Sequence, residues 1–269
     1  MRPKKLNFEL VVGLILISFI ALLAFIGFFY TPYDPNVMDI AHKLQPPSLS
    51  HLLGTDQFGR DVLSRIMVGS QLVLLVGISV VGISLVIGGG LGILAGYYGG
   101  IIDSAIMKLI EIKMAFPGTL LALMLIAIAS PSVAIIILAL SIMNIPRFTR
   151  VVRSGYLQYK NATFVEAAKV LGLSNTRIML VHILPNISSS IYVTAALSFS
   201  SAILSEAGLS YLGLGLQPPL ASWGKMLNEA QPYMIQSPLL AIIPGIMITM
   251  IVLGVNLLAD GLRKNLSIE

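Results

Sequence analysis

The chain contains no cysteine and few charged residues. The absence of cysteine among the 269 residues excludes disulfide scaffolds, thiolate metal centres and cysteine nucleophiles. Charged residues make up 11% of the chain, whereas soluble domains carry roughly 25%. Hydrophobic residues make up 56%. This composition excludes an ordinary soluble domain, which needs more charge to cover its surface, and indicates a membrane protein.

The chain contains several long segments without charged residues. The first, Leu10–Tyr30, has 21 residues and no A-x-A-like site after it, so it is interpreted as a retained helix and not as a signal peptide. Isolated strands cannot cross lipid because their backbone groups would stay unpaired, so the runs predict an all-α bundle. The six expected spans are Leu10–Tyr30, Gln71–Gly96, Ser104–Ala129, Val133–Ile145, Ser189–Leu209 and Ser237–Ala259.

Basic residues gather on one side of these spans. They precede the first span, follow the last, and fill the segment between the fourth and fifth: Arg2, Lys4, Lys5, Arg263, Lys264, Arg147, Arg150, Arg153, Lys160, Lys169 and Arg177. Because cytoplasmic loops of membrane proteins are enriched in Lys and Arg, both termini are expected in the cytoplasm. The net charge of +5 is distributed between apolar runs, which argues against a nucleic-acid partner.

Two regions are expected within one membrane protein. Residues 1–70 form an N-terminal membrane helix with an extracytoplasmic loop, and residues 71–269 form a transmembrane domain with a cytoplasmic loop at 147–185. Within the second span, three glycines repeat every four residues: Gly88, Gly92 and Gly96. Small residues at this spacing predict close packing of two helices, within the subunit or between subunits. Trp223 and Tyr233 suit a membrane interface.

The cytoplasmic loop carries two short helix signatures. Thr163 and Glu166 have the spacing of a capping box, which predicts the start of a helix. Gly172 fits the left-handed position at which a helix ends. Ser174 or Asn175 then caps a second helix. These signatures predict a helix–turn–helix elbow, residues 163–185, that projects from the membrane; a solvated connector is the alternative.

The elbow resembles the EAA signature of the integral membrane subunits of bacterial ATP-binding-cassette (ABC) importers. The matching residues are Glu166, Ala167, Ala168, Gly172, Leu184 and Pro185. His182 departs from the pattern, because isoleucine is commonest at that position. Two further segments resemble the same family: G-T-D-Q-F-G-R-D at residues 54–61, and S-Y-L-G-L-G-L-Q-P-P followed by S-W-G at residues 210–224. In this order and spacing they are similar to the second permease of dipeptide, oligopeptide and nickel importers.

The resemblance implies a set of partners and a location. The six matching elbow residues are expected to dock on an ATPase subunit and couple it to transport. The expected partners are a second permease, two ABC ATPase subunits, an extracytoplasmic substrate-binding protein and membrane lipid, in the bacterial cytoplasmic membrane. Peptides are the first expected substrate, and nickel or a metal chelate is the alternative. No cofactor is expected.

The chain is not expected to be an enzyme. It has no G-x-x-x-x-G-K-[ST] segment, since Gly224-Lys225 lacks the preceding loop, so the ATPase must be another chain. His42, His51 and His182 are dispersed outside the expected spans, which predicts neither a catalytic nor a metal site. A stand-alone channel or ion-coupled carrier is a remoter alternative, which inverted repeats or midplane charges would favour.

Four charged residues outside the elbow are candidates for function. Glu206 lies within the fifth expected span, where ionisable groups are costly, so it is expected to act in the pathway or gate, or to pair with a polar group. Asp56, Arg60 and Asp61 lie in the extracytoplasmic loop. They are expected to contact the receptor or the partner permease, or to form an internal salt-bridged loop.

Overall fold

The structure is a computed structural model that describes residues 7–129 and 131–266, and its named elements are all helical. The all-α prediction is therefore confirmed. The elements are α1 Phe8–Phe29, η1 Ile40–His42, α2 Val62–Tyr98, α3 Gly100–Ala115, α4 Gly118–Ala129, α5 Val133–Tyr159, α6 Thr163–Val170, α7 Asn175–Arg177, η2 Ile178–Ile183, η3 Leu184–Ile187, α8 Ser188–Tyr211, α9 Trp223–Ala230, η4 Gln231–Tyr233 and α10 Leu239–Leu266.

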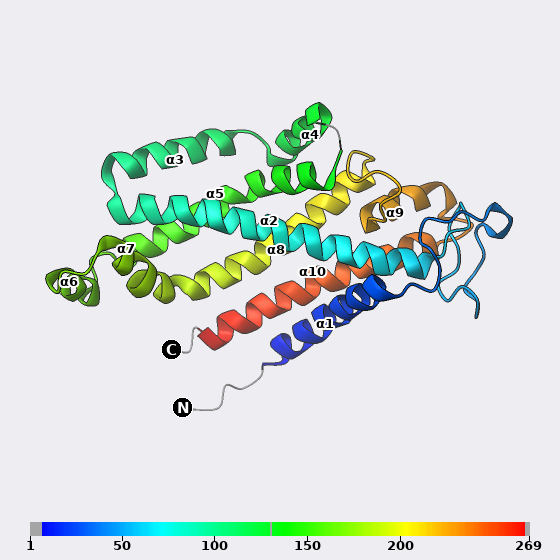
Figure 1. Cartoon of the computed structure of the whole chain (residues 1–269), viewed down its shortest axis with the longest axis horizontal. Helices are drawn as coiled ribbons and strands as arrows, with labels where there is room; N and C mark the ends of the chain where they lie inside the picture. The colour runs from blue at the N-terminus through cyan, green and yellow to red at the C-terminus, as the bar shows by residue number, and fades with distance from the viewer. Residues whose placement is uncertain (1–6, 130, 267–269) are drawn as a thin grey trace.

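The long helices run back and forth along one axis (Figure 1). Five helical stretches are long and apolar enough to cross a membrane: α1, α2, α5, Asn175–Tyr211 and α10. Helices α3 and α4 meet at an angle of 80° and make a sixth span if they are counted as one. The start of α1 and the end of α10 lie toward the end of the bundle that carries α6 (Figure 1). The expected six spans agree with this upper count.

Two helices extend beyond their expected spans. Helix α2 begins at Val62 because the Asp61 carboxylate accepts a hydrogen bond from the Ser64 amide at 2.8 Å, and the expected division at residue 70 therefore lies inside α2. Helix α5 does not end at Ile145 but continues through the buried Pro146 to residue 159. Packing against α2 holds α5 together across the proline, which by itself would weaken the helix.

The pairing of α2 with α5 is the most extensive between any two helices, and the glycine stripe explains it. A Cβ on Gly92 would lie 2.7 Å from the Thr149 carbonyl oxygen, and a Cβ on Gly88 would lie 2.6 Å from that of Ile145. These distances leave room for hydrogen only. The predicted close approach is therefore confirmed, and it lies within the subunit.

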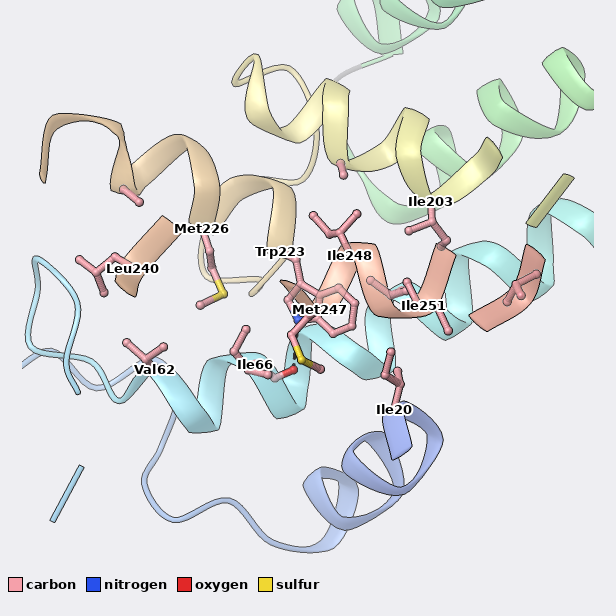
Figure 2. Packing of buried hydrophobic residues seen from close by; sticks show 14 residues of the cluster. Ile20, Val62, Ile66, Ile203, Trp223, Met226, Leu240, Met247, Ile248 and Ile251 are labelled. Carbon is pink, nitrogen blue, oxygen red and sulfur yellow. Dashed lines mark hydrogen bonds between the residues drawn. The ribbon is translucent and has the colours of Figure 1, made fainter. Parts of the chain in front are cut away.

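A large buried apolar core joins α1, α2, α8, α9 and α10. Figure 2 shows Trp223 near its centre, surrounded by Ile66, Met247 and Ile248. The Trp223 side chain is fully buried and its Nε1 donates to the Ile66 carbonyl at 3.2 Å. The expected membrane-interface position of Trp223 is wrong, because the segment after α8 turns back and inserts the indole between helices.

Candidate functional site

The elbow begins with α6, whose start differs from the expected capping box. Ala162 is the N-cap, no side chain caps the helix, and Thr163 is already its first residue. The Ala162 carbonyl accepts from the amides of Val165 and Glu166 at 2.8 and 3.1 Å, so the helix starts one residue earlier in register than predicted. The capping-box prediction is wrong, whereas the predicted helix is present.

The turn at Gly172 has the predicted left-handed conformation, with φ of 76°. The Gly172 amide donates to the Lys169 carbonyl and the Leu173 amide donates to the Ala168 carbonyl, at 3.0 and 3.1 Å. These two bonds form a Schellman motif, which satisfies carbonyls left free at a helix end. The Ser174 hydroxyl then accepts from the Arg177 amide at 3.4 Å, so Ser174 is the cap of the second helix.

The second half of the elbow does not break at Pro185. It passes from α7 through the π-helical η2 and the 3-10 helix η3 into α8 without a gap. Pro185 lies in the first turn of η3, where a backbone N–H is not needed. Only the helical pitch changes at this proline, and the elbow is continuous with a membrane-spanning helix.

The inner face of the elbow packs on α5. Val165, Ala168, Ile178 and Ile183 form a buried apolar cluster that also contains Tyr156. The Tyr156 hydroxyl donates to the Met179 carbonyl at 2.8 Å. Buried apolar contact and a buried hydrogen bond together make the elbow a rigid extension of α5.

The six residues of the EAA resemblance differ in their exposure to solvent. Glu166, Ala167, Gly172 and Pro185 are exposed, whereas Leu184 is partly buried. The side chain of Ala168 is only 4% exposed and packs inside the elbow, where its small size lets α6 approach η2 closely. The structure thus places Ala168 in the elbow's own core and leaves the exposed four available to a partner.

Three apolar residues on the outer face were missed by the sequence analysis. Val170 is 88% exposed, Leu171 is 78% exposed and Phe164 is 39% exposed. Exposed apolar side chains gathered at the tip of a loop that is expected in water make this tip a candidate for protein contact. Their apolar character within a polar segment was the available signal.

The extracytoplasmic candidates are buried in a network of ion pairs. Arg60 Nε lies 2.6 Å from Asp56 Oδ2, and Arg60 Nη2 lies 2.8 Å from Glu229 Oε2. Arg65 lies within 3.8 Å of the same two carboxylates. Asp61 caps α2, and its Oδ1 accepts a hydrogen bond from His51 Nδ1 at 3.0 Å. This is the internal salt-bridged loop among the two expected alternatives.

The network fastens the loop at residues 31–61 to α2 and α9, at the end of the bundle opposite α6 (Figure 1). Glu229 was missed by the sequence analysis, because 169 residues separate it from Arg60. Gly59 is required inside the loop: its φ is 76°, and a Cβ there would lie 1.7 Å from the Asp39 carbonyl oxygen. The loop at residues 31–61, which includes the G-T-D-Q-F-G-R-D segment, is therefore a folded structure, called the cap below.

Glu206 lies inside α8 and pairs with two hydroxyls. Its Oε1 accepts from Ser210 at 2.7 Å and from Ser222 at 2.8 Å, and its side chain is buried. The Ser210 hydroxyl also accepts from the Leu216 amide at 3.2 Å. The carboxylate thereby fixes the segment between α8 and α9, which is the polar pairing expected as one alternative for this residue.

Two protein-family profiles match the chain. The profile described as binding-protein-dependent transport system inner membrane component matches residues 88–267. The chain belongs to this family. A second profile, the N-terminal transmembrane domain of oligopeptide transport permease C, matches residues 10–47 of the same permease.

Individual relatives agree with the family assignment. The permease is 42% identical to the dipeptide transport system permease protein DppC of Alkalihalophilus pseudofirmus, over 98% of this chain and 87% of that protein. It is also 42% identical to the glutathione transport system permease protein GsiD of Pectobacterium atrosepticum, over 94% and 84% of the two chains. The solved methionine ABC transporter MetNI, in an inward-facing conformation, has the same fold, with a TM-score of 0.61 at 17% identity over 75% of this chain and 94% of that chain.

Family membership establishes the role of the chain in general terms. It is a multi-pass inner-membrane permease of an ABC import system and not the enzyme that hydrolyses ATP. A binding-protein-dependent system implies an ATPase and a substrate-binding protein as partners. The elbow and the cap lie at opposite ends of the bundle (Figure 1).

Proposed function

We propose that the chain imports peptides, forming the translocation pathway together with a second permease. Two ATPase subunits drive the assembly and an extracytoplasmic binding protein delivers the cargo. The relatives named for dipeptide and glutathione transport support peptides over the alternative of nickel or a metal chelate. Both termini are cytoplasmic in this proposal, because α1 starts and α10 ends near the elbow (Figure 1).

The observation that carries the proposal is the rigid elbow with an apolar tip. Val170 and Leu171 are the most exposed large apolar side chains of α6 and its turn. Glu166 and Ala167 lie exposed on the same short helix. A surface of this composition suits a groove on an ATPase subunit, where apolar anchors contribute most of the binding energy and the polar rim adds specificity.

Coupling follows from how the elbow is attached. When ATP binding draws two ATPase subunits together, the displaced elbow moves α5 through the cluster around Tyr156. Helix α5 in turn moves α2, because the close contacts at the α2 glycines leave no space for the two helices to shift against each other. The two helices therefore move as one body, which favours switching between two packed arrangements over gradual deformation.

The remaining candidates receive roles within this assembly. The cap of Asp56, Arg60 and Asp61 presents a folded surface to the binding protein or to the second permease, and its ion pairs keep that surface in shape. Glu206 supports the outer gate by holding the segment that precedes α9. Both roles are positional, since these side chains are buried.

The decisive experiment removes one apolar anchor. In reconstituted complete transporter, Leu171→Asp should lower ATPase association roughly tenfold, since a buried hot-spot contact is worth that much or more. Leu49→Asp is the matched control, because Leu49 is fully exposed on the cap at the other end of the molecule. Uptake of dialanine at full rate with the ATPase omitted would contradict the proposal and favour a stand-alone carrier.

A further inference from the structure

Three cations line one cavity of about 480 Å³ where α3, α4 and α5 meet. They are Lys113 on α3 and Arg147 and Arg150 on α5. No carboxylate is among the residues that line this cavity in the described part of the chain. Like charges gathered within candidate spans are costly, so such a cluster is a candidate for function.

The three cations are not paired with acids. Lys113 Nζ donates to a neutral group, the Met143 carbonyl, at 3.1 Å. Arg147 and Arg150 are exposed and make no ion pair with any residue in 7–129 or 131–266. Arg153, one turn further along α5, shows the contrast: it is paired with Asp103 at 2.5 Å. The cavity therefore offers positive charge that no described side chain neutralises.

A helix start adds to this charge. Helix α4 begins at Gly118, which lines the same cavity, directly after the 80° break from α3. The amides of Gly118, Thr119 and Leu120 precede the first backbone bond of the helix, from the Leu121 amide to the Pro117 carbonyl. Such amides carry the positive end of the helix dipole. In many secondary transporters, substrate groups are bound where membrane helices are broken.

A second cavity, of about 710 Å³, shares Arg147 with the first. Its lining includes Ser201 and Ser205 of α8 and Asn256 of α10, which can donate and accept hydrogen bonds. Its volume is in the range that holds a small ligand. Arg147 thus lies at the junction of the cationic cavity and a chamber lined by both hydroxyl and leucine side chains.

We propose that Arg147 and Arg150, with Lys113, bind the terminal carboxylate of a peptide in transit, while the serine-lined chamber holds the rest of the peptide. This inference rests on the proposed function. An anionic lipid headgroup offers the same oxyanion chemistry. The chamber favours a peptide, because its hydroxyl and amide side chains match peptide groups while its leucine side chains can receive the apolar side chains of a peptide. Guanidinium groups suit carboxylates because they can donate two parallel hydrogen bonds.

Cysteine labelling of the complete transporter tests the site directly. The chain has no cysteine, so Met114→Cys places a single thiol in it at the cavity. We would compare a negatively and a positively charged methanethiosulfonate. Arg147→Gln should lower the ratio of anionic to cationic reaction rates roughly fivefold, because one fewer cation attracts the anionic reagent. At Ile101→Cys, an exposed position of α3 outside the cavity, Arg147→Gln should leave the ratio unchanged.

Protection identifies the ligand. Dialanine should slow the anionic reagent at the cavity cysteine, alaninyl-alaninamide at equal concentration should not, and Arg147→Gln should remove the difference. Equal protection by the amide, or none by either, would overturn the site. Protection that appears only when phosphatidylglycerol replaces phosphatidylcholine would assign the cavity to lipid instead. If dialanine leaves the labelling rate unchanged while receptor-dependent dialanine uptake is normal, this site alone is refuted. If dialanine uptake is absent, the proposed cargo is refuted.

Discussion

The hydroxyl of Tyr156 donates a 2.8 Å hydrogen bond to the backbone carbonyl of Met179, and this bond joins α5 to the π-helical part of the elbow. Both residues are buried within the cluster at the base of the elbow. Under the proposed function, a displacement of the elbow would reach a membrane helix through this fixed contact.

Tyr156→Phe should weaken coupling without unfolding the permease. Loss of this hydrogen bond costs about 1 kcal/mol and leaves a buried carbonyl less well satisfied. We expect fewer peptides imported per ATP hydrolysed, measured in proteoliposomes, and a lower Tm in detergent. Tyr159→Phe is the control, since its hydroxyl has no hydrogen bond among the described residues. Equal coupling ratios for the two variants would show that the bond is not part of the transmission.

Gly172→Ala should cost more than the same change at Gly82. Neither glycine has a neighbouring atom within 4 Å of an added Cβ, so the substitutions differ in backbone conformation alone. At φ of 76° an alanine is strained by roughly 1–2 kcal/mol, whereas Gly82 is in an ordinary helix. The expected result is normal membrane insertion with ATP hydrolysis uncoupled from uptake in Gly172→Ala, and stronger still in Gly172→Val. Normal uptake by both Gly172 variants at normal expression would rule out a role for the turn.

Gly92→Ala should destabilise the α2–α5 contact, whereas Gly90→Ala should not. A methyl group on Gly92 would overlap the Thr149 carbonyl, and one on Gly90 would meet no atom within 4 Å. Overpacking of this kind costs typically about 1–3 kcal/mol. Thermal unfolding of the purified transporter measures the difference, and a Tm of Gly92→Ala at or above that of Gly90→Ala would contradict the close packing.

The two ends of the bundle should be accessible from opposite sides of the membrane. Ser48 lies exposed in the cap and Ser174 lies exposed in the elbow. Single cysteines at these positions, in a chain that has none of its own, should react with an impermeant reagent from outside and from inside respectively. Labelling of both from the same side would refute the six-span orientation.

Some features of the elbow and the cap could be predicted from the sequence, and others could not. Gly172 was predicted from sequence because the left-handed position at a helix end depends on local chemistry. Thr163 was misassigned because α6 begins one residue earlier, with Ala162 at the N-cap position and no side-chain cap. Glu229 could not be predicted as the partner of Arg60, since only the fold brings α9 beside the loop.

By itself, the sequence determined that the chain is helical and lies in a membrane, that two glycine-dependent features exist, and which family it resembles. These follow from hydrophobic run length, spacing and local backbone preference, which are properties of nearby residues. The tertiary structure decided that Trp223 is buried, that Ala168 faces inward and that three cations from α3 and α5 share a cavity. Such facts depend on which distant surfaces pack together, and packing is settled by the whole chain at once.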